Sequence, residues 1–178
     1  APSRGLGDVY KRQALDKIGA EFEKGTLFLP QLIMSAGVAQ AAFEVIRKHM
    51  VMSDNAPVSK GKIVIATVKG DVHDIGKNIV KVLLENYGYD VIDLGKDVEY
   101  QAVVDAIRDN DVKLCGLSAL MTTTLVSMKE TIALIRENNL DCKVMVGGAV
   151  LTPEYAKEID ADFYAKDAKE SVDIAKRV

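Results

Sequence analysis

From residue 62 onward the sequence alternates short apolar runs with amphipathic segments, and this pattern constrains the fold more than any other feature of the chain. Near-continuous apolar runs are typical of strands buried on both faces of a parallel sheet. The predicted strands span residues 62–68, 89–95, 112–120, 142–149 and, more weakly, 161–167. Strands that alternate with helices predict an α/β fold with a doubly wound, five-stranded parallel sheet, for which we expect the flavodoxin-like strand order 2-1-3-4-5.

Apolar residues at helical spacing predict the helices between these strands. The three stripes consist of Ile75, Ile79, Val80, Leu83 and Leu84, then Val103, Ala106 and Ile107, then Leu125, Met128, Ile132 and Ile135.

The region before residue 62 has a different organisation. Apolar residues recur at helical spacing from 14 to about 25 and again from about 30 to 51, which predicts a partial helical-bundle cap of two helices over residues 14–52. The polar stretch 53–61 predicts a linker, and residues 62–178 form the α/β domain. Residues 1–13 lack apolar periodicity, and we expect a non-native or disordered leader there.

Charge and cysteine content exclude several classes of protein. Lys and Arg number 23 and Asp and Glu 26, so the chain lacks the basic footprint that a phosphate backbone selects. Cys115 and Cys142 lie in apolar contexts that suit reduced core thiols. The sequence contains neither a membrane-spanning apolar run nor a signal-peptide pattern. We therefore expect a cytoplasmic protein with no nucleic-acid or membrane partner.

Three loops should meet at the rim of the predicted sheet where the strands end. Ligands of open α/β sheets bind outside the carboxyl ends of the strands, where the strand order reverses. The polar and small residues in these loops are Asp71, His73, Gly76, Ser118, Thr122, Thr123, Thr124, Gly147 and Gly148. Taken singly, each has an ordinary explanation: Asp71 as a helix cap, the hydroxyl residues as turn and cap residues, and the glycines as a tight turn.

Taken together, these residues resemble the signature of the cobalamin-binding domain of corrinoid methyltransferase systems, which reads DxHxxG, then SxL, then GG. Between Gly76 and Ser118 lie 41 residues, Leu120 completes the SxL, and 26 residues separate Leu120 from Gly147. The segment "FEKGTLFLPQLIMSAGV", residues 22–38, resembles the helical cap that precedes this domain in the family. The family cap has four helices and only two are predicted here, so we expect either a partial cap or one completed by another chain.

The resemblance implies a role for each residue. It implies His73 as the lower axial ligand of cobalt, with Asp71 and Ser118 completing a hydrogen-bonded relay. A carboxylate on the far ring nitrogen fixes the tautomer of a ligating histidine and raises its basicity. The other implied cofactor-binding residues are Asp74, Ile75, Gly76, Leu120, Thr122, Gly147, Gly148, Tyr164, Phe28 and Val38. From the residues alone, Tyr164 is equally a half-buried strand residue and Val38 a helix-packing residue.

The resemblance further implies a methyl carrier whose cobalamin, or a related corrinoid, alternates between cob(I)alamin and methylcobalamin. Its implied partners are a substrate-specific methyltransferase, a second methyltransferase with a thiol or folate acceptor, and a reductive activase, with self-association through the incomplete cap as a further possibility. By itself the chain would not be catalytic.

Three alternatives remain open. A cobalamin-dependent sensor should carry a DNA-binding segment and a cap tryptophan, and the sequence contains no Trp. The binding subunit of an adenosylcobalamin mutase should lack the "FLPQ" helix. A signalling receiver domain should place an acidic cluster and a phosphorylatable Asp at the rim, where the third strand here ends near Ser118.

Overall fold

The computed structural model of the protein describes residues 59–178 and ten positions before them, namely 17, 18, 20, 21, 24, 31, 34, 37, 38 and 41. The chain divides into two units, Ala1–Val58 and Ser59–Val178. In the first unit, positions 17, 18, 20 and 21 are helical, as are positions 31, 34, 37, 38 and 41. The expected leader over residues 1–13 and most of the expected linker lie outside the described residues.

Five parallel strands form the centre of the second unit. They are β1 (Lys62–Thr67), β2 (Asp90–Asp93), β3 (Leu114–Ser118), β4 (Lys143–Gly147) and β5 (Phe163–Ala165). Their order in the sheet is β2-β1-β3-β4-β5, which confirms the expected flavodoxin-like order. The order reverses between β1 and β3, so the loops that follow these two strands lie at the switch point where α/β sheets bind ligands.

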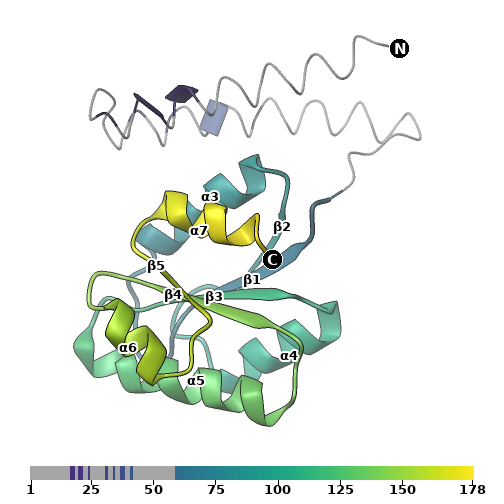
Figure 1. Ribbon diagram of the computed structural model, residues 1–178, viewed down its shortest axis with the longest axis vertical. Helices are drawn as coiled ribbons and strands as arrows, with labels where there is room; N and C mark the ends of the chain where they lie inside the picture. Colours follow the sequence, from purple (N-terminus) through teal and green to yellow (C-terminus); the bar gives the residue numbers. More distant parts are fainter. Residues whose placement is uncertain are drawn as a thin grey trace. The chain divides into compact units, whose positions relative to one another are not determined.

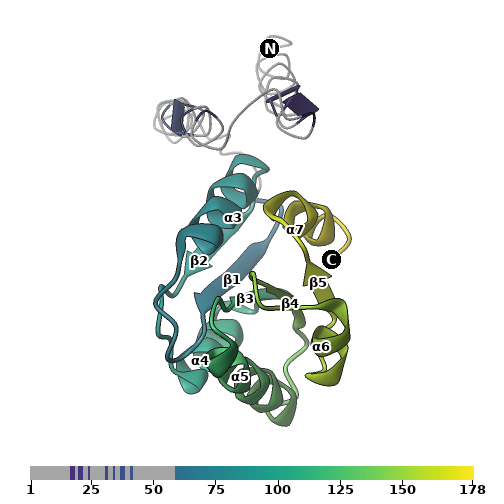
Figure 2. The same ribbon diagram turned by 90° about the vertical axis from the view of Figure 1, so that its left-hand side faces the viewer.

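Helices cover both faces of the sheet, as Figures 1 and 2 show. One face carries α3 (Ile75–Asn86) and α7 (Ala168–Ala175), and the other carries α4 (Tyr100–Asn110), α5 (Leu125–Glu137) and α6 (Pro153–Glu158). A short 3-10 turn, η1 (Thr122–Thr124), leads from β3 into α5. In the part of the chain that the structure describes, no helix is long and apolar enough to cross a membrane.

The core consists of two apolar clusters, one on each face of the sheet, because successive side chains of a strand point to opposite faces. Ile63 and Ile65 of β1 belong to the cluster beneath α3 and α7, whereas Val64 and Ala66 belong to the cluster beneath α4, α5 and α6. All four side chains are buried.

The second of these clusters also contains the two cysteines, and both are free thiols. Burial raises the pKa of the Cys142 thiol to about 12 and that of the Cys115 thiol well above its usual value. Both thiols are therefore protonated and unreactive at neutral pH, because the thiolate is the nucleophilic form.

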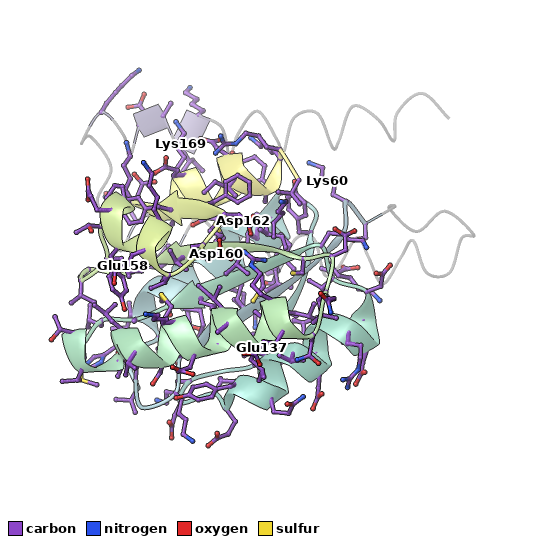
Figure 3. The ribbon with its side chains drawn as sticks, turned by 60° about the horizontal axis from the view of Figure 1, so that its bottom comes forward. Lys60, Glu137, Glu158, Asp160, Asp162 and Lys169 are labelled. Atoms are coloured by element: carbon purple, nitrogen blue, oxygen red, sulfur yellow. The ribbon has the colours of Figure 1, made fainter. Side chains whose placement is uncertain are left out.

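Arg136 stabilises the amino-terminal ends of β4 and β5, away from the loops that follow β1 and β3. Its guanidinium donates hydrogen bonds to Asp160 Oδ2 at 3.1 Å and to Asp162 Oδ2 at 2.7 Å. Figure 3 shows these two carboxylates in the connection between α6 and β5. Asp162 also accepts a hydrogen bond from the backbone N–H of Val144 in β4 at 2.7 Å. These charge-assisted bonds hold the start of β5 beside β4.

Candidate functional site

Asp71 is the central hydrogen-bond acceptor of the rim. It lies in the loop between β1 and α3, and its side chain is fully buried. Its Oδ1 accepts hydrogen bonds from the backbone N–H of His73 at 3.0 Å and from the ring Nδ1 of the same residue at 2.8 Å. Its Oδ2 accepts from the backbone N–H groups of Leu120 and Met121 at 2.8 and 3.1 Å and from the hydroxyl of Thr124 at 2.9 Å. One carboxylate thus joins the loop after β1 to the loop after β3.

These donors keep Asp71 ionised. Burial by itself would raise the pKa of the carboxyl, because a low dielectric penalises the charged form. The hydrogen bonds from His73, Leu120 and Thr124 outweigh burial and hold the pKa of Asp71 far below its usual range. The carboxylate is therefore an anion at neutral pH and accepts a hydrogen bond from the N–H of the imidazole beside it.

His73 is held at one ring nitrogen. Because Asp71 is an anionic acceptor, Nδ1 carries the proton when the imidazole is neutral, and Nε2 keeps its lone pair. The side chain of His73 is 46% exposed, and among the described residues no hydrogen bond to Nε2 is present. The ring therefore presents an oriented nitrogen donor at the switch point of the sheet.

Ser118 does not occupy its expected place in the relay. Its hydroxyl lies 3.0 Å from Oγ1 of Thr67, and within residues 59–178 it shares no hydrogen bond with Asp71. The hydroxyl on Asp71 belongs instead to Thr124, six positions further on. The physical reason is strand register: Ser118 is the last residue of β3 and lies directly opposite Thr67 of β1. The chain must turn through η1 before a hydroxyl reaches the carboxylate.

Thr67 and Thr124 are the site residues that sequence reasoning missed. Thr67 is fully buried, and its hydroxyl lies 3.4 Å from the backbone carbonyl of His73, beneath the loop. No motif marked Thr67, because it is the last residue of an otherwise apolar strand. The run of threonines at 122–124 was a signal for Thr124, but a turn or cap role explained that run equally well.

The glycines of the rim differ in how much room the surrounding residues leave for a side chain. A Cβ on Gly148 would lie 1.9 Å from the carbonyl oxygen of Ala119, and Gly148 has a φ of +134°, so the close approach of β3 and β4 itself requires glycine. A Cβ on Gly147 would lie 3.2 Å from the carbonyl of Ala165. Among the described residues, a Cβ on Gly76 would meet no atom within 4 Å. Within this part of the chain, open space therefore remains beside the start of α3.

Exposed apolar side chains lie next to the histidine in sequence and in the loop after β3. Val72 and Ile75, on either side of the histidine in sequence, are 56% and 75% exposed, and Leu120 is 42% exposed. Ile75 thus departs from the expected buried stripe of α3, because it is the first residue of the helix and lies at the rim rather than over the sheet. Val126 in the first turn of α5 is also exposed.

The remaining expected residues have weaker links to this rim. Asp74 precedes α3 as its N-cap without a side-chain capping bond, and Thr122 is exposed in η1. The hydroxyl of Tyr164 donates to the backbone carbonyl of Leu151 at 3.3 Å, so a structural contact accounts for it. Val38 belongs to the first unit, where it is exposed, and Phe28, another expected cofactor-binding residue, lies outside the described residues.

A histidine anchored at one ring nitrogen, at the switch point of an open parallel sheet, is typical of a ligand-binding α/β domain. The comparisons with known proteins agree. A family pattern described as the B12 binding domain matches residues 61–173, and a second pattern of the same description matches residues 12–47. Dimethylamine corrinoid protein 1 of Methanosarcina acetivorans is 42% identical over 166 residues, which cover 92% of this chain and 78% of that protein.

Solved structures give the same result. A cobalamin-binding protein from Desulfitobacterium hafniense has a TM-score of 0.77 and 34% identity, with coverage of 93% of this chain and 78% of that one. A chain of the methanol:cobalamin methyltransferase complex MtaBC from Methanosarcina barkeri has a TM-score of 0.82 and 33% identity, with coverage of 92% and 62%. The chain belongs to the B12-binding family of corrinoid proteins.

Proposed function

We propose that the protein is a methyl carrier that holds cobalamin with its own nucleotide base displaced and Nε2 of His73 as the lower ligand of cobalt. The observation that carries this proposal is the hydrogen bond of 2.8 Å between Nδ1 of His73 and the buried carboxylate of Asp71. A neutral imidazole nitrogen suits a borderline transition metal such as cobalt. A carboxylate on the opposite nitrogen fixes the ring and raises its basicity, as in other metal sites with histidine ligands.

The residues present at the rim fit a corrin ring. Val72, Ile75 and Leu120 offer apolar contact around the imidazole, and a macrocycle above His73 would cover them. Exposed apolar side chains in such a group mark a binding surface, because isolated domains rarely leave them uncovered. The displaced nucleotide tail of the cofactor would fit in the space beside Gly76, where a Cβ would meet no described atom within 4 Å.

When bound, the corrinoid supplies the metal that accepts and releases the methyl group. The protein's own residues bind and orient that cofactor. His73 ligates, Asp71 holds the proton on Nδ1, and the backbone N–H groups of Leu120 and Met121 with the Thr124 hydroxyl keep that carboxylate ionised. The chain thus orients and presents the cofactor, and the transfer steps belong to partner enzymes.

Two kinds of partner follow from this role. A substrate-specific methyltransferase loads the carrier, and relatives named for dimethylamine and for methanol support a methylated amine or methanol as the source. A second methyltransferase then unloads the methyl group onto a thiol or folate, and a reductive activase restores the cofactor after accidental oxidation. These relatives favour the carrier over a sensor or a mutase subunit.

Electron paramagnetic resonance tests the ligand directly. Uniformly 15N-labelled protein is loaded with unlabelled hydroxocobalamin and reduced to the cobalt(II) state. We expect superhyperfine splitting from a 15N nucleus, because the ligand nitrogen then comes from the protein. The His73→Ala variant should lose this splitting, and His49→Ala, which removes the only other histidine in the sequence, should retain it. Splitting from 14N alone in the wild type would show that the cofactor's own base still binds cobalt.

A further inference from the structure

The loop between β2 and α4 is joined to the loop that carries the candidate cobalt ligand. Oδ1 of Asp97 accepts a hydrogen bond from the backbone N–H of Gly70 at 2.7 Å. The backbone N–H of Asp97 donates to the carbonyl of Asp71 at 2.9 Å. One residue of a neighbouring loop therefore holds the main chain on both sides of the Asp71 Cα.

Flanking contacts reinforce this junction. Val68 and Val98 form an isolated parallel bridge that extends β1 beyond its last regular pair. The ammonium group of Lys69 lies 2.8 Å from the Glu99 carboxylate. These contacts hold the two loops side by side, and the two Asp97 bonds are the ones that reach Gly70 and Asp71.

The backbone of Asp97 is shaped for these two bonds. Its φ is +54°, in the left-handed region, which disfavours most side chains but which Asp tolerates better than others. The strained conformation is retained at a position where one residue supplies both a donor and an acceptor to the neighbouring loop. Strain of this kind persists where the surrounding structure over-determines it.

We propose that Asp97 is a positioning residue for the His73 imidazole, an inference that rests on the proposed role of His73 as ligand. The Asp71 carboxylate must meet donors from two directions, His73 in its own loop and Thr124 across the rim. Its side chain can do so only while its main chain stays in place. Asp97 holds that main chain at Gly70 and Asp71, and so fixes the orientation and the tautomer of a ring that it does not touch.

Two substitutions separate the hydrogen bond from the backbone conformation. Asp97→Gly keeps the left-handed backbone without strain and removes the acceptor. Asp97→Asn keeps an acceptor oxygen and also tolerates the left-handed region. The matched control is Asp111→Gly, because Asp111 has a similar φ of +49° at the C-cap of α4, and its exposed carboxylate pairs with Lys113 instead of with the rim.

The readout is the side-chain 15N spectrum of His73 in the protein without cofactor, recorded at alkaline pH. The His73→Ala variant assigns the signals. We expect the Nδ1–H tautomer to dominate in the wild type, Asp97→Asn and Asp111→Gly. In Asp97→Gly the ratio of Nδ1–H to Nε2–H should fall on the order of threefold to tenfold, as expected when a hydrogen bond of about 1 kcal/mol is lost.

Two results would overturn the positioning role: an unchanged tautomer ratio in Asp97→Gly, or an equal fall in Asp97→Asn or Asp111→Gly. Amide hydrogen exchange of Gly70 in the same samples should quicken in Asp97→Gly alone, which confirms that the intended bond was removed. Because this experiment contains no cobalamin, its failure is distinct from a failure of the 15N splitting that tests His73 as the cobalt ligand.

Discussion

Thr124 Oγ1 lies 2.9 Å from Oδ2 of Asp71, and 53 positions separate the two residues in the chain. Thr124 is buried at the end of the 3-10 turn before α5, and Asp71 is buried in the loop after β1. The bond crosses the point where the strand order reverses. It therefore makes the ionisation of Asp71, and through it the state of His73, depend on the correct packing of β1 against β3.

Removal of the Thr124 hydroxyl should destabilise the protein. Thr124→Val keeps the shape of the side chain but leaves Oδ2 of a buried carboxylate one donor short, which should cost about 1 to 3 kcal/mol in the free energy of unfolding. Urea titration at neutral pH measures this difference. Thr124→Ser retains a hydroxyl and should recover most of the loss, while Thr122→Val, at an exposed threonine of the same turn, should cost little.

Ser118→Ala should behave differently from Thr124→Val. The Ser118 hydroxyl pairs with Thr67 and not with Asp71, so its loss should cost about 1 kcal/mol of stability without a change in the ionisation of the carboxylate. The 15N spectrum of His73 should stay as in the wild type. A fall in the proportion of the Nδ1–H tautomer in Ser118→Ala would restore Ser118 to the relay.

Stability should fall in acid partly through Asp71. Its pKa in the folded protein is lowered, so the unfolded chain binds its proton first as the pH falls. The stabilisation that the carboxylate contributes is fully present above about pH 5 and is lost progressively as the pH falls through the ordinary value of about 4 toward the lower folded value. Asp71→Asn should therefore be less stable than the wild type at neutral pH.

The measurement is the free energy of unfolding of both proteins at a series of acidic pH values. The gap between wild type and Asp71→Asn should narrow steadily below about pH 4. A gap that stays constant over this range would show that Asp71 titrates alike in the folded and unfolded states.

Alanine substitutions at Gly76 and Gly148 should have different effects, the first on cobalamin binding and the second on stability. Gly76→Ala places a methyl group in open space at the start of a helix, so stability should stay equal or rise by about 0.5 to 1 kcal/mol. Cobalamin affinity should fall, because the methyl group occupies the space proposed for the nucleotide tail. Gly148→Ala must relieve a contact of 1.9 Å with Ala119 at a left-handed φ and should unfold far more easily.

Thermal unfolding and cobalamin titration of both variants check this contrast. Unchanged cobalamin affinity in a stable Gly76→Ala protein would place the tail elsewhere.

The exposed apolar rim should matter for the cofactor and not for the fold. Ile75→Asp places a charge at a side chain that is 75% exposed, so the free energy of unfolding should change by less than about 0.5 kcal/mol. Cobalamin affinity should fall by about tenfold or more, because the charge would be buried under the macrocycle. Val178→Asp, at an apolar residue that is also exposed, is the control and should bind as the wild type does.

The sequence by itself determined the five strands of a parallel sheet, because strands that are buried on both faces must be apolar throughout. The strand order was an expectation from the fold class, which the structure confirms. The family resemblance implied the pairing of Asp71 with His73, and the structure shows this hydrogen bond within one loop. The family signature added the corrinoid, which the comparisons with relatives confirmed.

Only the tertiary structure decided which hydroxyl completes the site. Ser118 and Thr124 are both polar residues after β3, and no spacing rule distinguishes them; strand register turns the first toward Thr67 and the turn of η1 brings the second to Asp71. The contact of Asp97 with Gly70 could not be predicted from the sequence either. The two residues are 27 positions apart, and their loops are neighbours only because β1 pairs with β2. Contacts between loops depend on the sheet that places them, so they follow from packing and not from local pattern.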